Sequence, residues 1–190
     1  MFSLFPGRRN ESSTLVARMV GVKMGDRIAQ VGCANGACLA AVAAGVGLSG
    51  RAVAIVPDAP SAARAQKGAA RAGVLVEIET APPTRLPADT SAFDVAILDD
   101  SGGLFATMNA EDRSATVREL LRILRPGGRL MMIGAAPRSG FRALATRTQA
   151  STSFDPAPAL RANGFGPVRM LAERDGFVFI EGLKTRSPSE

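Results

Sequence analysis

The residues that could do chemistry in this chain lie in a glycine-rich segment and in a pair of neighbouring acids. The segment Val31-Gly32-Cys33-Ala34-Asn35-Gly36 follows a short apolar run. A glycine-rich turn between a strand and a helix lets a ligand approach the backbone and meet the amides of the helix N-terminus. Asp99 and Asp100 follow another apolar run, and a carboxylate there could accept a proton during group transfer.

The composition excludes several other kinds of site. There is no His among the 190 residues, which removes the commonest general base and every Ser-His or Cys-His nucleophile pair. Cys33 and Cys38 form no disulfide framework and have no metal-ligand spacing around them. We therefore predict no metal site and a reducing, cytoplasmic compartment.

Charge and hydropathy limit the partners further. The net charge of +6 is scattered along the chain, and the only aromatic residues are Phe, so we do not expect nucleic acid as a partner. No apolar run approaches the ~20 residues of a membrane span, and the first residues lack the apolar region of a signal peptide. The expectation is a protein with no transmembrane segment.

Helical and strand patterns alternate along the chain, which indicates a mostly parallel sheet covered on both faces. The predicted helices lie at 12–20, 37–46, 61–72, 110–124 and 156–163, and the predicted strands at 27–31, 52–56, 74–78, 93–98 and 129–133. Asp175-Gly176 between apolar runs at 168–172 and 177–183 predicts an antiparallel hairpin at the end. We expect an arm at 1–11, a single domain at 12–185 and a tail at 186–190.

Three segments in this order, 25–36, 91–98 and 119–130, give the chain a family resemblance over roughly residues 12 to 184. It resembles the class I S-adenosylmethionine (SAM) dependent methyltransferases, and within them the type 11 group that includes the ubiquinone and menaquinone methyltransferases. The resemblance implies an α/β, Rossmann-like three-layer sandwich. Its sheet would have seven strands, mostly parallel, with an antiparallel last strand inserted between strands five and six. The implied cofactor is SAM.

The resemblance also implies a set of cofactor-binding positions. They are Gln30, Gly32, Cys33, Ala34, Asn35, Gly36, Val56, Pro57, Asp58, Pro82 and Asp99. Several depart from the family pattern, which has an acid at Gln30, a ribose-binding acid at Val56 or Pro57, and often an Asp at Pro82. Asp58 could replace the ribose ligand or only cap a helix. Ala34 stands where the family has a glycine, so it requires a negative φ and room for a methyl group. These departures predict weak SAM binding.

Methyl transfer from a sulfonium depends mainly on positioning, so no catalytic side chain is strictly required. Asp99 and Asp100 are the candidates for a base. The expected acceptor is a small molecule or a lipid-like molecule, and a protein partner or a second copy could complete an open pocket. Residues 141–154 are a candidate lid. The alternative function is a non-catalytic methyltransferase-like protein that binds a partner or another ligand.

Overall fold

The chain folds into alternating strands and helices in the computed structural model, which describes residues 7–136 and 155–186. The elements, in chain order, are α1 (Gly7–Val20), β1 (Arg27–Val31), α2 (Gly36–Val46), β2 (Arg51–Val56), α3 (Ala59–Ala72), β3 (Glu77–Thr80), β4 (Phe93–Asp100), α4 (Ala110–Ile123), β5 (Leu124–Ala135), α5 (Ala157–Ala162), β6 (Phe165–Arg174) and β7 (Phe177–Lys184). The candidate lid at 141–154 lies outside the described residues.

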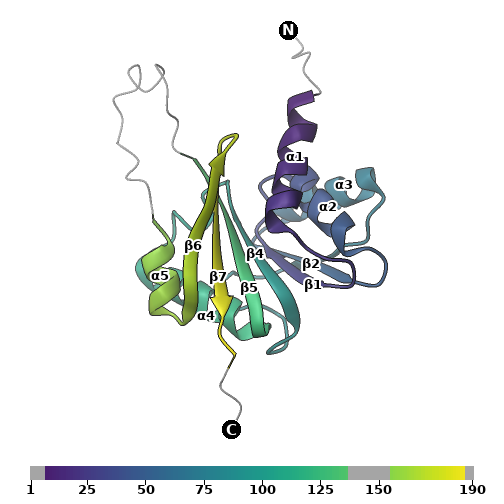
Figure 1. The fold of residues 1–190 in the computed structure, drawn as a ribbon. Coiled ribbons are helices and arrows are strands. Elements are labelled where there is room, and N and C mark those ends of the chain that lie inside the picture. Colours follow the sequence, from purple (N-terminus) through teal and green to yellow (C-terminus); the bar gives the residue numbers. More distant parts are fainter. Residues whose placement is uncertain (1–6, 137–154, 187–190) are drawn as a thin grey trace, which may run out of the picture.

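The strands form one sheet in the order β3-β2-β1-β4-β5-β7-β6. The first five strands pair in parallel, and β7 pairs antiparallel with both β5 and β6. Figure 1 shows β7 lying between β5 and β6. The predicted seven-stranded sheet, with its antiparallel strand inserted before the edge, is confirmed.

Helices cover the two faces of the sheet separately, as the predicted three-layer sandwich requires. On one face, Val16 and Val20 of α1 and Val42 of α2 pack against Ile28 and Ile97. On the other face, Val117 and Leu120 of α4 and Leu160 of α5 belong to a second cluster. Its strand residues include Val31 and Leu98, which alternate along β1 and β4 with the residues of the first face. Figure 1 shows α1, α2 and α3 grouped together, away from α4 and α5.

Several element bounds differ from the predicted ones. Helix α1 begins at Gly7, not at Ser12 or Ser13, so part of the predicted arm is helical. Strand β3 begins at Glu77 rather than at residue 74. Val74 and Val76 pack against the core clusters, but ladder pairing starts only at Val53↔Glu77. Their apolar character reflected burial and not strand pairing.

The predicted strand at 93–98 ends too early, because Asp99 and Asp100, expected in the loop after it, belong to the strand. They are the last two residues of β4, and they pair with Ile133 and Gly134 of β5. A carboxylate can be buried at a strand end when it accepts hydrogen bonds from nearby amides. Both acids do so, as described below.

Local signals for turns and caps are largely confirmed. Asp175 and Gly176 both have positive φ, 52° and 84°, which is the geometry of a two-residue hairpin turn. Asn109 caps α4 by accepting a hydrogen bond from the Asp112 amide at 2.8 Å. Among the described residues, no helix combines the length and the apolarity needed to cross a bilayer.

Candidate functional site

A cleft opens at the carboxyl ends of β1, β2 and β4. This is where the strand order reverses, the usual ligand position in open α/β sheets. The cleft has a volume of about 180 Å³. The lining comes from the loops after β1 and β4 and from the start of α3, and it consists of Gly32, Cys33, Ala34, Pro57, Asp58, Ser61, Arg64, Asp99, Gly102 and Leu104.

The two glycines of the loop after β1 are required by packing inside the fold. Gly32 has φ +84°, and a Cβ there would lie 2.8 Å from the Asp99 carbonyl oxygen. A Cβ on Gly36 would lie 2.2 Å from the Arg64 carbonyl oxygen, and one on Gly68 would lie 2.1 Å from the Gly36 carbonyl oxygen. The start of α2 therefore packs directly on the backbone of α3, and this contact fixes the loop against α3.

Asp99 holds the glycine-rich loop from below. Its side chain is buried, and Oδ2 accepts a hydrogen bond from the Ala34 amide at 2.9 Å. Oδ1 accepts from the Ser101 amide at 3.2 Å and from the Ser101 hydroxyl at 2.6 Å. Because both carboxylate oxygens are occupied, this acid ties the loop after β1 to the loop after β4.

Asp100 turns away from the cleft and does not line it. Its Oδ1 accepts hydrogen bonds from the amides of Phe105 at 2.6 Å and Ala106 at 3.1 Å. Burial raises the pKa of this carboxyl above its usual value, and the neighbouring Asp99 charge acts in the same direction. Asp100 therefore organises the turn after β4.

Gln30 and Ala34 stand at positions where the sequence departs from the family pattern. The Gln30 side chain is buried, and its Nε2 donates to the Gly32 carbonyl oxygen at 3.1 Å, so this group supports the loop and does not line the cleft. Ala34 is not among the residues with positive φ. Ala34 is exposed and lies opposite Gly102. A Cβ added to Gly102 would lie 3.2 Å from the Ala34 methyl carbon, so the glycine leaves room for this methyl group. Both conditions for Ala at this position are met.

Three polar residues at the start of α3 face the cleft. Asp58 caps the helix, with Oδ1 accepting from the Ser61 amide at 2.7 Å. Hydrogen bonds from Ser61 lower the pKa of this exposed carboxyl, and the Arg64 charge lowers it further. Arg64 donates through Nε to the Cys33 carbonyl oxygen at 3.0 Å and through Nη2 to the Ser61 hydroxyl at 2.6 Å.

Arg64 is the cleft residue that sequence reasoning missed. The spacing held the signal, because Asp58, Ser61 and Arg64 are three residues apart at a predicted helix start and so fall on one face. The guanidinium clamps the loop carbonyl from the α3 side, while Asp99 binds the loop amide from the β4 side. The loop is thus held at two points by opposite charges.

The remaining predicted loop residues have structural roles. Cys33 and Cys38 are free, buried thiols. Burial, with a smaller contribution from Asp99, raises the pKa of each thiol to about 11, so both stay protonated at neutral pH. Asn35 caps α2, its Oδ1 accepting from the Ala37 amide at 2.9 Å.

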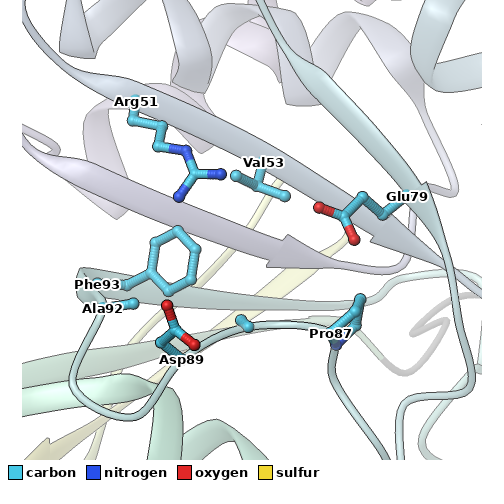
Figure 2. Close-up of a pocket in the computed structure, with 8 residues that line it drawn as sticks. Arg51, Val53, Glu79, Pro87, Asp89, Ala92 and Phe93 are labelled. Carbon is cyan, nitrogen blue, oxygen red and sulfur yellow. The ribbon is translucent and has the colours of Figure 1, made fainter.

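A second cavity, of about 240 Å³, lies away from all these residues. Figure 2 shows the Arg51 side chain above the Phe93 ring, with Glu79 and Asp89 facing the same space. Arg51 lies 5.9 Å from the Phe93 ring centroid and also forms an ion pair with Glu77 at 2.6 Å. None of the predicted site residues lines this cavity.

Comparison with known proteins decides the family. Residues 28–128, more than half of the chain, match the family described as a methyltransferase domain. The chain belongs to this methyltransferase family. The expectation of a SAM-dependent methyltransferase is confirmed, and its cofactor is SAM. No curated protein sequence matches the chain.

Solved methyltransferase structures share the fold at low sequence identity. A SAM-dependent methyltransferase from Aquifex aeolicus aligns with a TM-score of 0.74 and 16% identity, covering 95% of this chain and 94% of that one. A SAM-dependent O-methyltransferase from Thermotoga maritima aligns at 0.66 and 19%, covering 100% and 69%. A chain from the complex of the Haloferax volcanii Trm112 methyltransferase activator with a methyltransferase aligns at 0.65 and 16%, covering 94% and 91%.

The cleft of this methyltransferase fits SAM in position and retains one exposed acid. Asp58 presents its carboxylate on the rim, while Pro57 and Leu104 offer apolar surface in the same cleft. The other positions with a family acid hold none. Val56 ends β2 fully buried, and Pro82 is exposed and outside the cleft lining.

Proposed function

We propose that this methyltransferase transfers a methyl group from SAM to a small-molecule acceptor, with SAM bound in the cleft between the Gly32–Gly36 loop and α3. The observation that carries this proposal is the loop itself, held by Asp99 on one side and Arg64 on the other at the carboxyl ends of the strands. A cleft with polar residues in its lining, Asp58, Ser61 and Arg64, suits a polar acceptor better than a lipid-like one.

The residue roles follow from the contacts. Asp58 would bind the ribose hydroxyls, because its carboxylate is exposed and lines the cleft. The loop residues that line the cleft, Gly32, Cys33 and Ala34, would approach the methionine part closely. SAM supplies an activated methyl group. The methyl group would pass from the SAM sulfonium to the acceptor, with the carbon–sulfur electron pair left on sulfur, and the acceptor would lose a proton.

Asp99 and Asp100 are the two acids that the sequence offers as a base. Asp99 lines the cleft, but its two oxygens already accept three hydrogen bonds. Asp100 is directed into the turn after β4. We propose that Asp99 positions the loop and that the acceptor loses its proton to solvent.

We also propose weak SAM affinity. Family acids are absent at Gln30, Val56 and Pro82, and each lost charged hydrogen bond costs on the order of 1.5–3 kcal/mol. The loss of two weakens binding by roughly 10²–10⁴-fold. The two buried free thiols, Cys33 and Cys38, are consistent with the cytoplasm as the compartment.

Calorimetric titration with SAM and with S-adenosylhomocysteine tests the proposal. The Asp58→Asn variant keeps the ability to cap α3 but loses the charge, so it should bind SAM about tenfold more weakly than the wild type. Asp89→Asn, an exposed acid of the second cavity, is the matched control and should bind normally. Equal affinity of the Asp58→Asn variant would reject the ribose role.

The same titration separates the alternative function. Absence of heat with both ligands at millimolar concentration would favour a non-catalytic protein that binds a partner or another ligand. The Haloferax methyltransferase of similar fold is bound to an activator. In that outcome, a search for a protein partner of this chain would follow.

A further inference from the structure

Three large apolar side chains protrude into solvent from neighbouring loops. Met24 is 80% exposed, Leu48 is 94% exposed and Leu75 is 81% exposed. These are the most exposed large apolar side chains in the described part of the chain. They lie in the connections α1–β1, α2–β2 and α3–β3. Single exposed apolar residues are ordinary, whereas a group of them calls for an explanation.

The three side chains lie at the amino-terminal ends of three adjacent strands, along one side of the sheet. β1 pairs with β2 and β2 with β3, all in parallel, beginning at Arg27↔Arg51 and Val53↔Glu77. The residues just before adjacent parallel strands therefore meet at the same edge. A Cβ on Gly47 would lie 3.3 Å from Met24 Cγ, which brings Met24 beside the Leu48 loop. We name Met24, Leu48 and Leu75 the apolar edge.

Cations flank the apolar edge. Lys23 and Arg27 adjoin Met24, and Arg71 lies in the last turn of α3 before Leu75; all three are exposed. Three acids lie nearby. Asp26 accepts the Lys23 amide at 2.8 Å and keeps its negative charge, Glu77 pairs with Arg51, and Asp94 accepts the Arg27 amide at 2.7 Å and pairs with Arg125. Glu77 and Asp94 are each balanced by an arginine of their own, so Lys23, Arg27 and Arg71 outnumber the remaining Asp26. The edge therefore combines protruding apolar tips with an excess of positive charge, within a chain of net charge +6.

We propose that the apolar edge docks on an anionic phospholipid surface, with the three side chains inserted at the interface and the flanking cations on the headgroups. Apolar insertion and attraction of basic residues to anionic lipid are the two contributions that give reversible membrane binding. A stable protein interface buries about 800 Å² per partner, which three tips separated by charged residues do not offer. Self-association would bring equal positive charges together.

The docked orientation keeps the cofactor cleft open to water. The cleft lies at the carboxyl ends of the strands, while the apolar edge lies at their amino ends, the opposite edge of the sheet. Acceptor and cofactor would thus arrive from the aqueous side. The residues of the apolar edge are separate from those proposed to contact the cofactor.

Vesicle sedimentation tests the proposal. The full chain should sediment with vesicles of phosphatidylcholine mixed with phosphatidylglycerol, only weakly with phosphatidylcholine alone, and less at high salt. A triple variant, Met24→Ser, Leu48→Ser and Leu75→Ser, should bind at least tenfold more weakly. A Lys23→Glu, Arg71→Glu variant should also lose at least tenfold, since each basic residue near the surface contributes roughly fivefold.

Met170→Ser is the matched control, because Met170 is 62% exposed on β6, away from the apolar edge; it should bind like the wild type. If the triple variant fails to fold, Leu48→Ser alone replaces it and should still weaken binding. Wild-type protein that does not sediment with the mixed vesicles would overturn the proposal. So would equal binding by the triple variant, or a solution dimer that the triple variant abolishes.

Discussion

Asp99 and Asp100 are adjacent acids, but their hydrogen bonds predict different responses to replacement by Asn. Asp99 uses both oxygens, one for the Ala34 amide and one for Ser101. The Asp99→Asn side chain has one accepting oxygen, and its NH₂ group would face either the Ala34 amide or Ser101, which are both donors. The loop after β1 should therefore be held less firmly. We expect SAM affinity to fall about tenfold, the effect of one lost charged hydrogen bond, as measured by calorimetry.

Asp100→Asn is the control for that variant. Both hydrogen bonds of Asp100 end on Oδ1, which an amide oxygen can replace, and burial disfavours the charged form. This variant should keep near-wild-type stability and SAM affinity. If Asp99→Asn binds SAM normally but turns over slowly, Asp99 acts as the base and the positioning role is wrong.

The sequence predicted where the glycine-rich loop lies in the fold, but not how the loop is held. The loop from Gly32 to Gly36 was correctly placed because glycine and cap signals are local. The spacing from Asp58 places Arg64 on the cleft side of its helix, but the sequence does not predict the contact that its guanidinium makes with a carbonyl oxygen 31 residues earlier in the chain. The glycine pattern alone is compatible with a ligand contact or with a tight turn, and only the packing of Gly36 against α3 shows a structural requirement for that glycine.

At the scale of elements, the order of strands and helices was predictable because hydrophobic periodicity and turn residues are local properties. The ends of the strands were less predictable, because pairing with a neighbouring strand determines where a strand begins and ends. Strands β3 and β4 illustrate this. The contact between α2 and α3 is the clearest non-local requirement, and it gives a testable consequence.

Gly68→Ala should be strongly destabilising. The added Cβ would lie 2.1 Å from the Gly36 carbonyl oxygen, and this contact can be relieved only by moving α3 away from α2. Overpacking of this kind typically costs about 1–3 kcal/mol or more, as measured by urea denaturation. Gly134→Ala is the matched control, because its Cβ would meet only the Val178 carbonyl oxygen at 4.0 Å. Equal stability of both variants would contradict the close helix contact.

Helix α4 holds the long connection between β3 and β4 through one acid and one cation. Glu119 accepts the Leu86 amide at 2.7 Å and pairs with Arg122, which donates to the carbonyl oxygens of Leu86 and Ala88. Hydrogen bonding to Arg122 lowers the pKa of Glu119 below its usual value near 4.5. The ionised Glu119 therefore stabilises the fold above about pH 4.5, and this stabilisation disappears as the pH falls through the lowered value.

Glu119→Gln should consequently lower the free energy of unfolding by about 1–3 kcal/mol at neutral pH. The difference from the wild type should shrink below about pH 4. Glu77→Gln breaks a comparable but half-exposed pair with Arg51, and exposed pairs are worth only about 0–1 kcal/mol. A Glu119→Gln deficit that persists unchanged in acid would show that packing, and not the charge, accounts for the loss.

At the scale of the whole molecule, binding of SAM to the native state must raise the thermal midpoint, by an amount that reports affinity. A ligand present at its dissociation constant stabilises by about 0.4 kcal/mol, and one at a thousandfold excess by about 4 kcal/mol. For a chain of 190 residues, these stabilisations correspond to midpoint rises of roughly 1–2 °C and roughly 8–16 °C.

Because the cleft retains only Asp58 as an exposed acid, we expect the smaller midpoint rise at millimolar SAM. Thermal denaturation over a range of SAM concentrations measures it, with the Asp58→Asn variant as the reference. A midpoint rise near 10 °C at millimolar SAM would mean that the backbone of the loop and Asp58 bind the cofactor tightly without the other family acids.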